Sequence, residues 1–83
     1  MSNNVVKFTL LGAMHTMNTS QKPEEVQAVA DIVDEKIRKI AKRRNMEPSQ
    51  AFGMMAALEI AEDLFNLRKD YERLLSLADD KNE

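Results

Sequence analysis

The residues that could perform acid–base or metal chemistry are few and lack partners. His15 is the single histidine, and no acidic residue lies near it in the sequence to orient the imidazole, as histidine catalysis normally requires. Glu59, Glu62 and Asp63 could gather on one helix face. Di-metal sites in helical bundles, however, use Glu-x-x-His pairs, and the chain has none. We therefore expect a packed histidine and a solvated acidic face, with no catalytic residue and no bound metal.

The sequence also offers few residues for nucleophilic catalysis or phosphate binding. The absence of cysteine excludes disulfides, cysteine-ligated zinc and thiol catalysis. Ser20 and Ser49 both precede expected helices, where a serine side chain commonly caps the helix. Gly12 and Gly53 are the two glycines of the chain, and they lie too far apart to form a phosphate-binding loop. The sequence therefore favours a protein that is not an enzyme and needs no cofactor.

One segment has a strong charge. Residues 35–44 contain six basic side chains against one acidic side chain, although the whole chain has a net charge of −2. The basic residues are Lys36, Arg38, Lys39, Lys42, Arg43 and Arg44. Such a segment could be a solvated helix end, or it could bind an acidic protein or a nucleic acid. The negative net charge and the aromatic content of 5% disfavour nucleic acid, so we expect no nucleic-acid partner.

Length and composition indicate a small folded domain that needs additional burial. The hydrophobic content of 43% is typical of a folded chain, but 83 residues bury only a small core. Without disulfides or a metal, association with other chains is the expected source of further stability. No apolar run approaches the roughly 20 residues that span a bilayer, and the first four residues lack signal-peptide features. We expect a cytoplasmic protein without membrane insertion.

The N-terminal part of the chain predicts a β-hairpin. Val5 to Leu11 is rich in β-branched and aromatic residues, Gly12-Ala13 suits a two-residue turn, and Met14 to Thr19 would return. The expected partners across the hairpin are Leu10 with His15, Phe8 with Met17, and Val6 with Thr19. The more polar face would carry Lys7, Thr9, Thr16 and Asn18. Because an isolated hairpin is barely stable and has two open edges, something else must cover it.

Two helices are expected after the hairpin. Pro23 suits the first helical turn, Glu24 and Glu25 suit the positive end of the helix dipole, and Asn45 is a reasonable cap. The apolar stripe of this helix would consist of Val26, Val29, Ala30, Val33, Ile37, Ile40 and Ala41. A second helix, from Pro48 to about Asp80, would be roughly 46 Å long. A compact chain of this size has a radius of gyration near 12 Å, so part of the second helix must project.

The projecting helix carries a heptad repeat. Two sets of core positions alternate at three- and four-residue spacing over four heptads, as a coiled-coil seam requires. The sets are Gly53, Ile60, Leu67 and Leu74, and Ala57, Leu64, Tyr71 and Ala78. We expect oligomerisation through the seam residues Ile60, Leu64, Leu67, Tyr71, Leu74 and Ala78. The sequence thus predicts an α+β protein, with a hairpin–helix head in residues 1–46 and an oligomeric coiled-coil tail in residues 47–83. The first turns of the second helix would complete the head.

The order and spacing of these segments resemble a known family. Val33-Asp34-Glu35-Lys36-Ile37 in the first helix, and Ala56-Ala57-Leu58-Glu59-Ile60-Ala61-Glu62-Asp63-Leu64 opening the coiled coil, are similar to the bacterial cell-division ZapA family. The resemblance covers roughly residues 5–78. The family commonly has asparagine where this chain has Glu59, and many members have a basic residue linked with filament binding where this chain has Ala13.

The resemblance implies a non-enzymatic cell-division scaffold. Its α+β heads would dimerise, its tails would associate further into tetramers, and it would bind and bundle filaments of FtsZ, the tubulin-like division polymer, at midcell. The alternative is a generic dimeric coiled-coil adaptor with another protein partner. The candidate partner-contact residues are Lys7, Thr16 and Asn18 on the hairpin and Lys42 and Arg43 at the end of the first helix.

Overall fold

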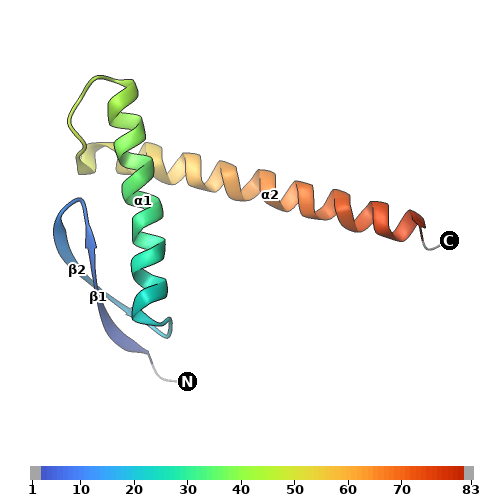
Figure 1. Ribbon diagram of the computed structural model, residues 1–83, viewed down its shortest axis with the longest axis horizontal. Helices are drawn as coiled ribbons and strands as arrows, with labels where there is room; N and C mark the ends of the chain where they lie inside the picture. Colours follow the sequence, from blue (N-terminus) through green and yellow to red (C-terminus); the bar gives the residue numbers. More distant parts are fainter. Residues whose placement is uncertain (1–2, 82–83) are drawn as a thin grey trace.

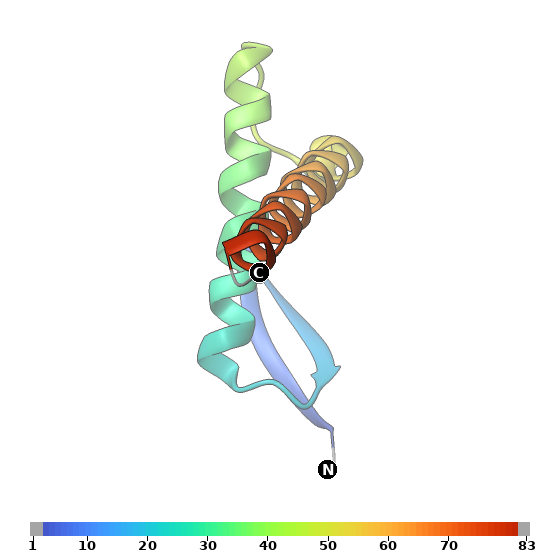
Figure 2. The ribbon, with the colours of Figure 1, turned by 90° about the vertical axis from the view of Figure 1, so that its right-hand side faces the viewer.

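The computed structural model describes the backbone of residues 3–81 and the side chains of residues 3–79. Its elements are β1 (Asn4–Leu10), β2 (Ala13–Thr19), α1 (Pro23–Arg43), a 3₁₀ turn (Gln50–Phe52) and α2 (Gly53–Lys81). The hairpin and α1 form a head, and α2 runs across α1 at a steep angle and projects far beyond it (Figures 1 and 2). The radius of gyration is 17.2 Å, well above the value of about 12 Å for a compact chain of this length. The predicted α+β class and the projecting helix are confirmed.

The register of the hairpin differs from the predicted register by two residues. Leu10 pairs with Ala13, Phe8 with His15, and Val6 with Met17. The turn consists of Leu11 and Gly12, with φ values of 52° and 76°, and two positive φ values are what a type I′ turn requires. The prediction placed the turn one residue later. Because the shift is an even number of residues, each side chain stays on its predicted face.

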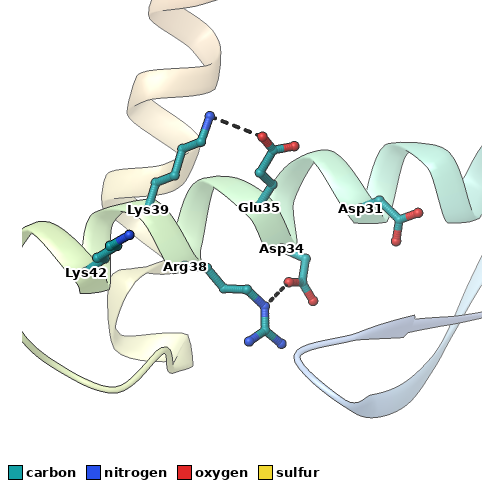
Figure 3. Close-up of a pocket in the computed structure, with 6 residues that line it drawn as sticks. All are labelled: Asp31, Asp34, Glu35, Arg38, Lys39 and Lys42. Atoms are coloured by element: carbon teal, nitrogen blue, oxygen red, sulfur yellow. Dashed lines mark hydrogen bonds and ion pairs between the residues drawn. The ribbon is translucent and has the colours of Figure 1, made fainter.

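A carboxylate on α1 stabilises this turn. The backbone N–H of Leu11 donates a hydrogen bond to Asp34 Oδ2 at 2.8 Å, which helps hold a leucine in the left-handed region. Arg38, one turn further along α1, donates to the other carboxylate oxygen of Asp34 (Figure 3). The hydrogen bond from Arg38, followed by the one from Leu11, lowers the pKa of Asp34 below its ordinary value. The carboxylate that holds the turn is therefore ionised at neutral pH.

Two of three predictions about the ends of α1 are confirmed, namely the start at Pro23 and the cap at Asn45, and the capping role of Ser20 is wrong. The helix begins at Pro23, as predicted, but Lys22 occupies the N-cap position and no side chain caps the helix, so Ser20 does not have the expected role. At the other end, Asn45 has a φ of 61°, and the N–H of Met46 donates to the carbonyl of Ala41 at 2.9 Å. This is the Schellman arrangement, in which a left-handed residue just past the helix closes the last turn.

The second helix starts later than predicted. Pro48 precedes it, and the Ser49 side chain accepts a hydrogen bond from the N–H of Ala51 at 3.2 Å. Ser49 therefore caps a short 3₁₀ turn, and regular α-helix begins only at Gly53. The capping role expected for Ser49 is confirmed, and the predicted helical start at Pro48 is wrong because the cap lies one residue beyond it.

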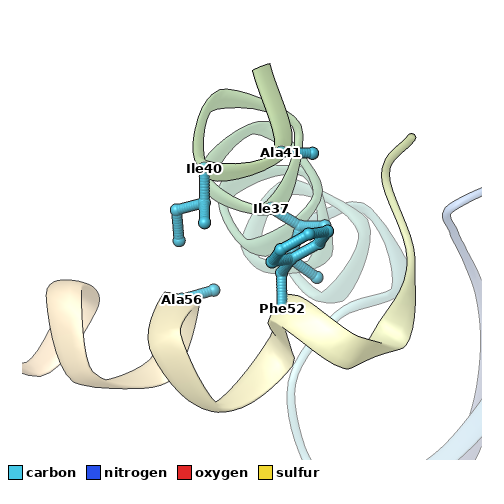
Figure 4. Packing of buried hydrophobic residues seen from close by; sticks show 5 residues of the cluster. All are labelled: Ile37, Ile40, Ala41, Phe52 and Ala56. Carbon is cyan, nitrogen blue, oxygen red and sulfur yellow. The ribbon is translucent and has the colours of Figure 1, made fainter. Parts of the chain in front are cut away.

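The main apolar cluster lies where α1 meets the beginning of α2. Ile37, Ile40 and Ala41 of α1 pack against Phe52 and Ala56, whose side chains point toward α1 (Figure 4). Ile40 and Ala56 are fully buried. Phe52 of the 3₁₀ turn and Ala56 of α2 thus anchor the long helix to the head.

Candidate interaction surfaces

Beyond residue 60, α2 buries none of its described apolar side chains within the chain. Every side chain from residue 61 to residue 79 is exposed, and Leu67 and Leu74 are 65% and 67% exposed. Among the predicted seam residues, Ile60 is half-buried and the others, Leu64, Tyr71 and Ala78 included, are exposed. Further exposed apolar residues outside the seam are Leu58, Phe65, Leu75 and Leu77. Uncovered apolar side chains on this scale are typical of a surface that packs against another chain.

Ion pairs between α1 and α2 engage two of the acidic residues considered for metal binding. Arg43 Nη2 donates to Glu59 Oε2 at 2.6 Å, and Lys36 Nζ lies 3.1 Å from Asp63 Oδ2 and 3.9 Å from Glu59 Oε1. Glu62 is exposed. Within the described side chains, no three acidic or histidine residues lie close enough to hold a metal ion. The acidic residues at the start of α2 therefore form a contact with α1.

The basic segment of α1 is largely neutralised inside the chain. Besides Lys36 and Arg43, Arg38 pairs with Asp34, and Lys39 pairs with Glu35 at 3.1 Å. Figure 3 shows the shallow pocket on α1 that is lined by charged residues, namely Asp31, Asp34, Glu35, Arg38, Lys39 and Lys42. Exposed ion pairs of this kind contribute only a few tenths of a kcal/mol each. They nevertheless reduce the net positive charge of this surface, because four of the six basic residues have an acidic neighbour.

The hairpin presents a mixed surface on the side that faces away from α1. We call it the outer hairpin face, and it consists of Val5, Lys7, Met14, Thr16 and Asn18, all of which are exposed. Thr9 shares this face of β1, but its hydroxyl contacts Gln27 of α1 at 3.4 Å. Lys7 lies directly across from Thr16, and Asn18 lies across from Val5. The candidate contact residues Lys7, Thr16 and Asn18 are thus neighbours, and all three are exposed. The apolar members of this face, Val5 and Met14, are 70% and 65% exposed, and they were not among the predicted contact residues.

The other two candidate contact residues lie elsewhere. The Gln27 side chain contacts Thr9 of β1, whereas Lys42 and Arg43 are at the C-terminal end of α1. The helical rise from Gln27 to Lys42 is about 22 Å. The five candidates therefore form two separate groups rather than one surface, and Arg43 is already paired with Glu59.

A groove runs between the hairpin and α1. Its lining includes Phe8, Leu10 and Met17 of the hairpin and Val29 and Val33 of α1, and its volume is about 540 Å³. His15 borders this side of the hairpin, where its ring stacks on Phe8 with 5.6 Å between the ring centroids, which fits the expected packed histidine. The sequence placed Val29 in the apolar stripe of α1, but 61% of its surface is exposed. The groove is a second apolar surface that the chain alone does not cover.

Comparison with known proteins identifies the family of the chain. A family model described as Cell division protein ZapA matches residues 6–82, nearly the whole chain. The chain belongs to the ZapA family. It is also similar to a Cell division protein ZapA of Geobacillus sp. (strain WCH70), with 28% identity over 70 residues, which cover 84% of this chain and 80% of the relative. No solved structure matches the chain.

Membership of the ZapA family makes this chain a cell-division protein. Within residues 3–81, neither helix has an apolar stretch long enough to cross a membrane. The long exposed α2 is compatible with the coiled coil predicted from the heptads.

Proposed function

We propose that this ZapA-family chain is a non-enzymatic scaffold that binds FtsZ filaments at midcell in the cytoplasm and cross-links them. The observation that carries the proposal is the uncovered tail, because residues 61–79 bury no side chain within the chain and present the heptad seam. In this proposal the heads pair into a homodimer, and tails with such a seam join two dimers into a tetramer.

Cross-linking follows from joining heads. One head with weak affinity for a filament would dissociate quickly, but a second head on the same rigid spacer binds at a high effective concentration. The 29-residue α2 is about 44 Å long, so in the proposed oligomer it keeps each head away from the far end of the associated tails. This division of the chain into a binding head and a spacing tail requires no catalytic group.

The outer hairpin face is the proposed contact with FtsZ. It combines exposed apolar side chains with polar ones and with Lys7, for which no acidic partner is found within residues 3–79. The competing group, Lys42 and Arg43, lies in a segment that is mostly neutralised by acidic residues of the same chain. Protein contacts combine apolar and polar groups in this way.

Co-sedimentation with FtsZ tests this proposal. The full chain is expected to pellet with FtsZ filaments at high speed, and Lys7→Glu is expected to reduce the bound fraction several-fold. Lys42→Glu is the matched control, with the same charge change at the far end of the head, and should bind like the parent chain. Absence of the parent chain from the filament pellet would remove FtsZ as the partner and leave the adaptor alternative. A loss confined to Lys42→Glu would move the contact to the end of α1.

A further inference from the structure

The two helices cross at a small apolar contact. Ile40 of α1 and Ala56 of α2 are fully buried, and their side chains point toward each other (Figure 4). Because α2 runs across α1 at a steep angle, the two helices share little length (Figures 1 and 2). Apolar packing has no preferred direction. A contact at the crossing point therefore resists separation of the helices more than it resists a swivel of α2 about that point.

Two carboxylates of α2 tie it to α1 beyond this crossing. Glu59 and Asp63 follow Ala56 at three- and four-residue spacing, so they lie on the same face of α2. Arg43 Nη2 donates to Glu59 Oε2 at 2.6 Å, and Lys36 Nζ donates to Asp63 Oδ2 at 3.1 Å. Lys36 Nζ also lies 3.9 Å from Glu59 Oε1. Among the described side chains, no ion pair joins the head to a residue of α2 beyond Asp63.

The two cations of α1 lie on opposite sides of the crossing. Lys36 precedes Ile40 and Arg43 follows it, at about 6 Å and about 5 Å along the helix axis. The ion pair of Arg43 with Glu59 draws α2 toward the C-terminal end of α1. The ion pairs of Lys36 draw α2 toward the N-terminal end of α1. The two attractions oppose each other about the crossing point, so together they define one direction for the tail.

These ion pairs are better shielded from solvent than the pairs within α1. The side chains of Lys36 and Glu59 are 22% and 30% exposed, whereas those of Lys39 and Glu35 are 66% and 68% exposed. Salt screens partly buried pairs less than exposed ones, and a network of charges contributes more than isolated pairs. Glu59 belongs to such a network, because it lies near both cations. The network can therefore bias a soft motion such as a swivel.

We propose that Lys36, Arg43, Glu59 and Asp63 form a clamp that fixes the direction in which the tail leaves the head. The tail is a long lever, because α2 continues for about 38 Å beyond the crossing. At that length, a swivel of roughly 10° moves the far end by about 7 Å. The effect of the clamp on the spacing of cross-linked filaments rests on the proposed function, whereas the clamp itself lies within a single chain.

Distances between spin labels test the clamp. The chain has no cysteine, so Glu24→Cys near the start of α1 and Ser76→Cys far along the tail introduce the two labelled sites. Both positions are exposed, and both lie outside the clamp and the predicted seam. Diluting the labelled protein in an excess of unlabelled full chain restricts the measurement to distances within one chain. Double electron–electron resonance then gives the mean distance between the labels.

Two neutralising substitutions are expected to shift this distance in opposite directions. Arg43→Met leaves only the ion pairs of Lys36, so the tail swings toward the N-terminal end of α1 and the labels approach each other. Lys36→Met leaves only the ion pair of Arg43, so the labels move apart. Glu24 and Ser76 lie about 24 Å and about 30 Å from the crossing, so a swivel of roughly 10° changes their separation by about 3 Å.

Lys39→Met is the matched control. It removes the same charge from the same helix, but Lys39 pairs with Glu35 of α1 and makes no ion pair with α2. This variant should keep the label distance of the parent chain. Circular dichroism on all three variants checks that they keep the helix content of the parent chain.

The direction of the two shifts decides the outcome. Opposite shifts in Arg43→Met and Lys36→Met, with no shift in Lys39→Met, support the clamp. Unchanged distances in both clamp variants, or shifts in the same direction, would overturn it. FtsZ is absent from this measurement, so a failure of the clamp leaves the proposed cross-linking intact. In the same way, a failure of the chain to pellet with FtsZ leaves the clamp intact.

Discussion

Leu67→Asp is expected to reduce the mass of the assembly at micromolar concentration. Leu67 is a central position of the predicted seam and is exposed in the single chain, so the substitution has little to disturb in the head. In the assembled tail it would bury an unpaired charge, which costs on the order of 3–5 kcal/mol. A cost of that size weakens association at least about a hundredfold. Light scattering coupled to size exclusion measures the change in mass.

The neighbouring position provides the control for this result. Asn66→Asp introduces the same charge one residue away, outside the seam, and should leave the mass unchanged. Leu74→Asp should behave like Leu67→Asp because the two residues occupy equivalent seam positions. If Leu67→Asp and Asn66→Asp give assemblies of the same mass, the heptad assignment of the tail is wrong.

Phe52→Ala is expected to cause the largest loss of stability within a single chain. Phe52 is 6% exposed and belongs to the cluster with Ile37, Ile40, Ala41 and Ala56. Truncating a buried phenylalanine to alanine typically lowers the free energy of unfolding by about 3–5 kcal/mol. Small domains have only about 5–15 kcal/mol in total, so the midpoint of urea unfolding, followed by circular dichroism, should fall sharply.

Phe65→Ala makes the same truncation at a position that is 62% exposed and lies outside the seam. It should lower the free energy of unfolding by only a small fraction of the Phe52→Ala effect. Equal losses for the two variants would mean that the junction of α1 and α2 does not anchor the tail. The comparison thus measures how much of the stability depends on the junction between α1 and the beginning of α2, where Phe52 is buried.

Local sequence signals predicted the elements whose ends depend on nearby residues. Pro23 starts α1 because proline is favoured in a first helical turn, and Ser49 caps the turn before α2 because a serine oxygen accepts a nearby N–H. The projection of α2 followed from its length alone. The helix ends depend on a few neighbouring residues, and the projection depends on the number of residues in the helix. The sequence was therefore sufficient to predict these features.

The hairpin register depends on a contact between distant residues. A glycine next to a non-glycine residue suits more than one two-residue turn, and the observed turn also needs a positive φ at Leu11. Asp34, 23 residues further along the chain, accepts the N–H that supports this conformation. No local rule contains that information, so the predicted turn was one residue late.

The candidate surfaces show the same limit. The pairing of Arg43 with Glu59 depends on how α2 crosses α1, and the separation of Lys7 from Lys42 depends on which part of α1 the hairpin covers. The seam of the tail differs from these surfaces because its heptads can be recognised in the sequence alone. The exposure of its leucines agrees with the heptads. The pairing of the seam with another chain stays a prediction.

Pelleting of FtsZ at two speeds tests the central claim most directly, because single filaments pellet only at high speed and bundles also pellet at low speed. The full chain is expected to move FtsZ into the low-speed pellet, and the double variant Leu67→Asp, Leu74→Asp is expected to leave the low-speed pellet as small as with FtsZ alone. A low-speed pellet that does not grow with the full chain, or that grows equally with the double variant, would contradict a cross-linker that acts through its associated tails.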